Sequence, residues 1–505
     1  MELRTGPIYA KAILYETWRV IMKTSTPEST GIPSPAISAF LMDLRENQYN
    51  MHSVLLMRHG DLIAEAYAAP YDQDRKHRMY SVSKTFTSMA VGLMIDEGRL
   101  SLDDKVVKFF PEYYPGSYDI LLESATIYDM LTMRDCHTDT SHGLGVKCNW
   151  LESWFLTPPS HPSGTIFNYN TTSTNLLAAI VERLSGTTMT EYLYPRLLTP
   201  IGFSQGCYCL PTPDGDSFGG SGIMCTPRDL ALLAQFAMNL GVWEGKQLIG
   251  RNYMQKAISA QSDTSLTGTS PELKNGYGFQ IWRLSHNGFA FFGIFSQIAA
   301  VFPDKGLVMV TTGNTADLYD GDTVITNIME RFYRHLFPRL SDKPLPENEA
   351  GFRELQSLSE LPQITAPGSP TSTVAAQVSG KIYALFPNNP GWRHARFEFG
   401  GNAGKLTYVN RHGEFEILFG MGYNVKFIFK DFKRLFGPPG CNCEAYGSAA
   451  WIDSRTLAVY LYFTDEEESF MRLNAVFDGE RTTILVKSHE GVMTDYGGYM
   501  YGYCK

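Results

Sequence analysis

Ser81 and Lys84 are separated by one helical turn in the run Met-Tyr-Ser-Val-Ser-Lys, which covers residues 79–84. Residues three apart on a helix lie on nearly the same face, so a lysine amine at this spacing can reach the serine hydroxyl. Burial or a nearby cation lowers the pKa of a lysine, and the neutral amine can then accept the serine proton. The pair therefore predicts a serine nucleophile activated by lysine, which would hydrolyse a carbonyl compound through an acyl-enzyme.

The elements around this pair favour the catalytic interpretation. By itself the Ser-x-x-Lys spacing has little specificity, because a helix-capping serine followed by a solvated lysine gives the same pattern. Here apolar residues at helical spacing predict an amphipathic helix over 81–97, and segments 53–58 and 62–67 predict a β-hairpin before it. Ser81 would then begin a helix, where its backbone N–H and the helix dipole can stabilise an oxyanion.

The segment 77–113 carries a family resemblance; it reads HRMYSVSKTFTSMAVGLMIDEGRLSLDDKVVKFFPEY. It resembles the nucleophile region of the serine β-lactamase-like hydrolases, which include class C β-lactamases, penicillin-binding DD-peptidases, esterases and amidases. The resemblance extends over about residues 26–337 and is strongest to the branch that contains 6-aminohexanoate-dimer hydrolase. It implies Ser81 as the nucleophile and Lys84 as its partner, with the adjacent Tyr80 as a substrate contact.

A second family element is matched by the run Pro-Ser-Gly-Thr-Ile-Phe-Asn-Tyr-Asn-Thr at 162–171. The family has a Tyr-x-Asn motif in this setting, and its tyrosine carries protons. The resemblance implies this role for Tyr169, since a phenol beside an ammonium has a lowered pKa. Thr171 stands where many members have asparagine, and the adjacent Asn170 is a candidate substrate contact.

The third family element, a Lys-Thr-Gly motif or a variant of it, has two candidate positions. Phe291-Phe292-Gly293 fits the spacing to the next strand better than the alternative, His286-Asn287-Gly288. In the first placement, Phe291 and Gly293 line the substrate site, and the Ile294 N–H joins that of Ser81 in an oxyanion hole. An apolar Phe291 in place of a cation favours neutral esters or amides, whereas His286 would keep some recognition of carboxylates.

The composition excludes several kinds of partner. The formal net charge is −9, and the absence of a long basic run argues against nucleic-acid binding. No apolar stretch reaches the ~20 residues that span a bilayer, and the N-terminus lacks a signal-peptide pattern, so we expect a cytoplasmic protein. The expected partner is a small ester, amide or peptide substrate; the sequence leaves the oligomeric state open.

We expect no metal and no organic cofactor. The Cys-x-Cys pairs at 207/209 and 441/443 have no nearby second pair that would complete a tetrahedral zinc site. The loop 135–142 contains two histidines and two aspartates, His137, His142, Asp135 and Asp139, but their spacing fits no recognised zinc pattern.

The predicted fold class is α+β. Strands at both ends of residues 26–343 surround a helical block, which predicts an antiparallel sheet flanked by helices with an inserted helical subdomain. We expect an irregular leader over residues 1–25, and the Pro- and Ser-rich stretch 344–373 is a predicted linker. Short strands at regular spacing over 374–505 predict an antiparallel, lipocalin-like barrel or a sandwich.

The residues together predict a serine hydrolase that acts on an ester or amide of a small substrate. One alternative is a D-Ala-D-Ala carboxypeptidase or a β-lactamase, whose substrates carry a carboxylate. Another is a ligand-binding or sensory protein on a hydrolase scaffold, because a fold alone does not imply activity.

Overall fold

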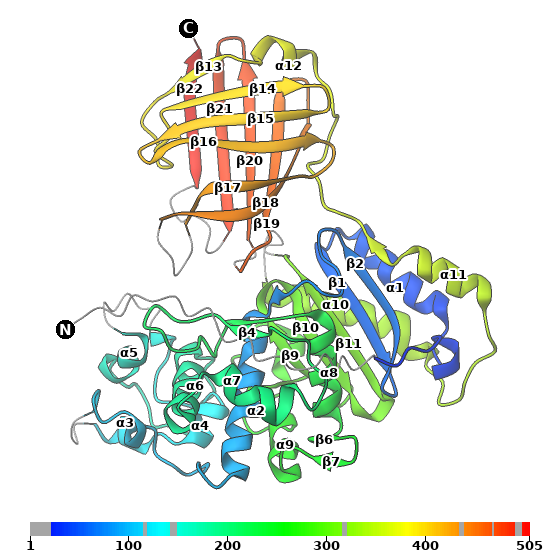
Figure 1. The fold of residues 1–505 in the computed structure, drawn as a ribbon, viewed down its shortest axis with the longest axis vertical. Coiled ribbons are helices and arrows are strands. Elements are labelled where there is room, and N and C mark those ends of the chain that lie inside the picture. The colour runs from blue at the N-terminus through cyan, green and yellow to red at the C-terminus, as the bar shows by residue number, and fades with distance from the viewer. Residues whose placement is uncertain are drawn as a thin grey trace.

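The computed structural model has a hydrolase-like domain of sheet and helices followed by an all-β domain (Figure 1). This architecture confirms the predicted fold class. The residues that the structure describes are 22–114, 119–141, 149–315, 321–433, 439–466, 469–489 and 497–504.

The first domain is built around a seven-stranded sheet in the order β12-β2-β1-β11-β10-β9-β8. All neighbours are antiparallel except β12 and β2. The predicted hairpin pairs with strands from the far end of the domain, as in the register Leu55↔Val310. The strands are β1 (Met51–Arg58), β2 (Asp61–Ala68), β8 (Trp282–Arg283), β9 (Phe289–Gly293), β10 (Gln297–Phe302), β11 (Leu307–Gly313) and β12 (Glu360–Leu361).

Helices cover both faces of this sheet, which explains why its strands are apolar on both sides. Alternate residues of β1 enter different cores: Leu55 packs with α2 and α8, and Leu56 packs with α1 and α10. The helices on the first face include α2 (Ser83–Asp96) and α8 (Pro227–Met238); those on the second are α1 (Ser34–Glu46), α10 (Gly321–Leu336) and α11 (Glu349–Ser357).

The helical subdomain lies beside α2 and is joined to it through α6. A small sheet, in the order β3-β5-β4, connects this subdomain to the segment that precedes Ser81. The helices of this region are α3 (Ile120–Ser124), α4 (Ile127–Leu131), α5 (Trp150–Leu156), α6 (Thr171–Ser185), α7 (Met189–Leu193) and α9 (Arg251–Ile258). The small sheet consists of β3 (His77–Arg78), β4 (Tyr208–Cys209) and β5 (Ile223–Cys225), and a separate pair consists of β6 (Val242–Trp243) and β7 (Lys246–Gln247).

The second domain is a ten-stranded sheet of antiparallel neighbours that closes into a barrel where β16 pairs in parallel with β18. Its interior is apolar and rich in aromatic side chains. Helix α12 (Thr373–Val378) precedes the strands, which are β13 (Ile382–Leu385), β14 (His394–Gly400), β15 (Ala403–Asn410), β16 (Gly413–Met421), β17 (Val425–Lys433), β18 (Pro439–Trp451), β19 (Thr456–Phe463), β20 (Ser469–Asp478), β21 (Arg481–His489) and β22 (Gly498–Cys504).

The segment 344–373 differs from an unstructured linker. It contains α11, which packs on α1, and β12, which adds a strand to the edge of the sheet beside β2. Leu355 of α11 is buried, so this short stretch has an apolar face that the proline and serine content conceals. In the described part of the chain, no helix is long and apolar enough to cross a membrane.

Candidate active site

The start of α2 brings Ser81 and Lys84 together. Ser81 lies in a short 3-10 turn, Tyr80–Val82, that leads directly into α2. The Lys84 Nζ lies 3.0 Å from the Ser81 Oγ. Tyr80, immediately before the nucleophile, has a φ of 45°, a left-handed backbone conformation that is costly for a large side chain and is typical of functional sites.

Lys84 is almost completely buried, with 1 % of its surface exposed. Its amine donates to the Ser81 Oγ, to the Thr171 Oγ1 at 3.3 Å and to the Gly220 carbonyl at 2.8 Å. All three acceptors are uncharged. Burial therefore lowers the pKa of Lys84 to about 7. A large fraction of the amine is neutral near pH 7 and can accept a proton from Ser81.

Tyr169 lies over this pair, just before α6. The Lys84 Nζ is 4.8 Å from the centroid of the Tyr169 ring, and the ring stacks on Trp282 with centroids 5.5 Å apart. Thr171 fills the third motif position and reaches Lys84, so a threonine hydroxyl takes the place of the family's asparagine amide.

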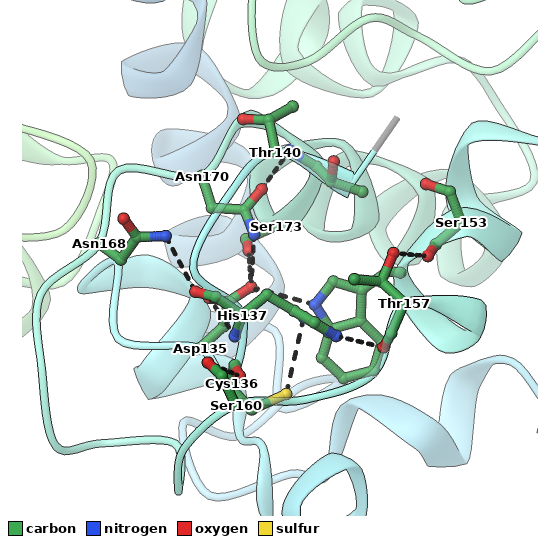
Figure 2. A network of polar contacts seen from close by, with 12 residues as sticks. Asp135, Cys136, His137, Thr140, Ser153, Thr157, Ser160, Asn168, Asn170 and Ser173 are labelled. Atoms are coloured by element: carbon green, nitrogen blue, oxygen red, sulfur yellow. Dashed lines mark hydrogen bonds and ion pairs between the residues drawn. The ribbon is translucent and has the colours of Figure 1, made fainter. Parts of the chain in front are cut away.

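The structure places Asn170 away from the substrate. Asn170 is fully buried, and its Oδ1 accepts the Thr172 N–H as the N-cap of α6. Its Nδ2 donates to the Asp135 carboxylate at 2.8 Å, within a buried network that Figure 2 shows. The side chain of Asn170 thus faces the protein interior, and its neighbours Tyr169 and Thr171 face Lys84.

Gly293 brings the end of β9 against the nucleophile. A Cβ at this position would lie 2.5 Å from the Met79 carbonyl oxygen and 3.1 Å from the Ser81 backbone nitrogen. Only glycine permits this approach without a shift of the backbone. Ile294 follows directly and lines the same cavity as Ser81. The two predicted oxyanion donors, the N–H groups of Ser81 and Ile294, therefore lie on adjoining segments.

Phe291 and Phe292 point to opposite faces of β9, because side chains alternate along a strand. Phe291 is 1 % exposed and belongs to the core formed with α2 and α8. Phe292 lines the cavity beside Ser81. The wall position that the sequence assigned to Phe291 is therefore occupied by Phe292.

The alternative motif lies at the other end of β9. His286 and Asn287 form the turn between β8 and β9, and both have a positive φ. The His286 ring packs edge-on against Tyr333 and Phe337, which belong to the helical layer on the second face of the sheet. This location matches a structural turn residue and separates His286 from Ser81.

A cavity of about 310 Å³ opens beside Ser81. None of the described residues that line it carries a charge, and Trp282 and Phe167 contribute aromatic walls that motif spacing did not reveal. The lining residues are Ser81, Phe167, Asn168, Tyr169, Thr267, Gly268, Thr269, Leu273, Trp282, Phe292 and Ile294.

The histidine loop packs against the helical subdomain through His137. The His137 Nε2 pairs with the Thr157 carbonyl oxygen at 2.9 Å, and the ring packs edge-on against Trp154. Among the described residues, no group of three or more His, Cys, Asp or Glu side chains could hold a metal ion. His142 lies outside the described residues.

The antiparallel sheet, the buried Ser–Lys pair at the start of α2 and the tyrosine above it define a class: the β-lactamase-like serine hydrolases. The family model described as Beta-lactamase matches residues 44–329, more than half of the chain. The chain belongs to this family, which consists generally of serine hydrolases.

The individual proteins that this chain resembles share only low sequence identity with it. The 6-aminohexanoate-dimer hydrolase of Paenarthrobacter ureafaciens is 25 % identical over 280 residues, which cover 51 % of this chain and 71 % of the relative. A Bacillus anthracis structure named for the same hydrolase aligns with a TM-score of 0.51 and 18 % identity, over 65 % of this chain and 89 % of its own. EstCE1, a hydrolase with promiscuous acyltransferase activity, has a TM-score of 0.50 and 17 % identity, over 59 % and 99 %. At these identities the structures support the fold alone.

Proposed function

We propose that this chain is an esterase or amidase that cleaves small, neutral substrates through an acyl-enzyme on Ser81. The observation that carries the proposal is the 3.0 Å contact between the Ser81 Oγ and a buried Lys84 amine whose pKa is lowered to about 7. A lysine buried among uncharged groups has the protonation behaviour of a general base near neutral pH.

The reaction would begin when Lys84 accepts the Ser81 proton as the Oγ attacks the substrate carbonyl. The carbonyl oxygen gains the negative charge, and the N–H groups of Ser81 and Ile294 stabilise it. The proton then passes by way of Tyr169 to the leaving alcohol or amine, and the carbon–heteroatom bond breaks. Water attacks the acyl-enzyme, the same groups return the proton to Ser81, and a carboxylic acid leaves.

The cavity supports a neutral substrate. A carboxylate that enters it would lose its hydration and meet aromatic walls, with no cation among the lining residues that the structure describes. The uncharged lining therefore argues against β-lactams and D-Ala-D-Ala peptides, which carry that carboxylate. EstCE1, a hydrolase of similar fold, and the 6-aminohexanoate-dimer hydrolase are consistent with ester or amide chemistry. The 6-aminohexanoate dimer carries a carboxylate, so this relative supports amide chemistry and not the neutrality of the substrate.

The proposal is tested by intact-mass analysis and peptide mapping after exposure to a fluorophosphonate probe. We expect a single adduct on Ser81 in the wild type and none in Ser81→Ala. Parallel assays compare a neutral p-nitrophenyl ester with an otherwise similar ester that bears a carboxylate; the neutral ester should turn over faster. Failure of the well-folded wild type to form an adduct would favour a ligand-binding protein on a hydrolase scaffold instead.

A further inference from the structure

Asp135 is a fully buried carboxylate that the reaction described above does not use. Its Oδ2 accepts three side-chain hydrogen bonds, from Trp154 Nε1 at 3.1 Å, Asn170 Nδ2 at 2.8 Å and Ser173 Oγ at 2.5 Å (Figure 2). Among the ion pairs of the described residues, its partner is His137, with an Nδ1–Oδ2 distance of 3.7 Å. Since no lysine or arginine among the described residues pairs with it, the buried carboxylate depends on these donors for stabilisation.

The donors connect Asp135 to the segment that carries the catalytic tyrosine. Trp154 belongs to α5, whereas Asn170 is the N-cap of α6 and Ser173 lies in the first turn of that helix. Asn170 lies between Tyr169 and Thr171, the two residues that face Lys84. The bond from Asn170 to Asp135 therefore fixes the backbone at the point from which both side chains project.

Further hydrogen bonds connect the same loop to this turn. The Asn168 N–H donates to the Met133 carbonyl at 2.7 Å, and the Asn168 Nδ2 donates to the His137 carbonyl at 2.9 Å. The Thr171 N–H donates to the Thr140 Oγ1 at 3.1 Å. The loop 133–140 thus forms a cradle for residues 168–171, with the Asp135 carboxylate as its charged acceptor.

Asp135 also belongs to a Cys–His–Asp cluster, which could suggest a second nucleophile. The Cys136 Sγ lies 3.7 Å from the His137 Nδ1. However, burial raises the pKa of Cys136 to about 12, so the thiol stays protonated, and the cysteine is fully buried. A buried, protonated thiol argues against a nucleophilic Cys136. The contacts of Asp135 instead point to a role in positioning residues 168–171.

We propose that Asp135 is a positioning residue that holds Tyr169 and Thr171 in register with Lys84. The inference rests on the proposed function of Ser81, Lys84 and Tyr169. Hydrogen bonds to a charged acceptor are stronger than neutral ones, and a supporting shell of this kind keeps catalytic side chains within the narrow tolerance that proton transfer needs. A displacement of about 1 Å costs on the order of 10²-fold in rate.

The central test is Asp135→Asn, which preserves the shape of the side chain, removes its charge and leaves one acceptor oxygen in place of two. We expect kcat for the neutral ester to fall about 10- to 100-fold with KM within about threefold. Hydrogen–deuterium exchange over residues 168–171 should become faster. Trp154→Phe is the matched control: it removes a donor to the same carboxylate on the α5 side and should lower thermal stability while kcat stays within about twofold.

A double variant that exchanges the side chains at positions 135 and 170 makes the test more specific. In the double variant Asp135→Asn with Asn170→Asp, the carboxylate at 170 can cap α6 and accept from the amide at 135, so at least tenfold of the lost kcat should return. An unchanged kcat and unchanged exchange in Asp135→Asn, or equal loss of kcat in Trp154→Phe, would overturn the inference. A folded double variant without recovery would also overturn it.

Failure of the proposed function gives a different result. In that case the wild type forms no adduct with the fluorophosphonate probe, whereas the exchange experiment still reports whether Asp135 holds the segment 168–171.

Discussion

Each domain buries a titratable side chain, Lys84 in the hydrolase-like domain and Asp431 in the barrel, and the two are used differently. Lys84 shares its amine among uncharged acceptors, one of which is a hydroxyl that faces a cavity. Asp431 is 5 % exposed, and its Oδ2 accepts from the Tyr408 hydroxyl at 2.8 Å and the Asn410 Nδ2 at 2.7 Å.

Burial favours the neutral form of both groups, so it lowers the pKa of Lys84 and raises the pKa of Asp431. The shift alone therefore does not mark an active site. What distinguishes Lys84 is a nucleophile within hydrogen-bonding distance at the edge of a cavity, whereas Asp431 is enclosed by Tyr408, Asn410 and an aromatic core. The comparison predicts that catalysis depends on the first group and is indifferent to the second.

The largest expected effect is the loss of acylation in Lys84→Ala. Without the amine, Ser81 has no base, and the rate of fluorophosphonate labelling should fall by at least about 10³-fold. The double variant with Ser81→Ala should be no worse than Ser81→Ala alone, because the two residues act as a unit. Labelling at a near-normal rate in Lys84→Ala would show that another group activates Ser81.

The next effect is the pH dependence of acylation. Only the neutral Lys84 amine accepts a proton, and burial places its pKa at about 7. The second-order rate of Ser81 labelling should therefore level off above pH ~7 and fall about tenfold for each unit below it. A stopped-flow or quench series from pH 5 to 10 measures this profile. A rate that keeps rising to pH 10 would indicate a lysine with an ordinary pKa.

A change in the cavity wall should change the preference of the enzyme for neutral or charged substrates. Phe292→Lys adds a cation beside Ser81, so the ratio of kcat/KM for a carboxylate-bearing ester over a neutral ester should rise about tenfold, equivalent to about 1.4 kcal/mol. Phe292→Leu is the matched control and should leave this ratio unchanged. If both variants change the ratio equally, the wall acts through its shape rather than its charge.

The sequence predicted the sheet, the helical subdomain and the all-β domain because their apolar periodicity is strong, but it left open whether the all-β domain is a barrel or a sandwich. It could not separate Phe291 from Phe292, since a one-residue shift in strand register reverses every side chain. Nor did it reveal the role of Asn170, because a polar residue beside a motif can face either the substrate or the interior. The helix α11 was hidden by flanking prolines and serines, and its apolar face becomes visible only against α1.

A smaller effect is expected in the barrel. Burial raises the pKa of Asp431, although the Tyr408 and Asn410 hydrogen bonds lower it. A folded pKa above the unfolded value means that stability is gained as pH falls through the folded pKa and lost as pH rises through it. Asp431→Asn should therefore leave turnover within about twofold and raise the melting temperature more at pH 7 than at pH 4. Loss of turnover would connect the barrel core to the active site.

The smallest effect is expected where the two domains meet. The Arg75 Nη2 lies 2.5 Å from the Glu444 Oε1 and donates to the Thr464 carbonyl at 2.8 Å, with both charged side chains about a quarter exposed. Burial alone would raise the pKa of Glu444, but hydrogen bonds from Lys426 and Arg75 hold it at about 2. The stabilisation is thus present above the ordinary pKa of a glutamate and is lost as pH falls towards 2.

Because solvent and salt screen this contact, Arg75→Ala should cost at most about 1 kcal/mol and leave kcat within about twofold. A double-mutant cycle with Glu444→Gln, measured by thermal unfolding at low and high salt, isolates the pair. Arg75 also lies three residues before Arg78 and six before Ser81. A clear loss of kcat with unchanged stability would therefore mean that the barrel holds the strand leading into the nucleophile, and the division between a catalytic domain and an indifferent one would fail at this contact.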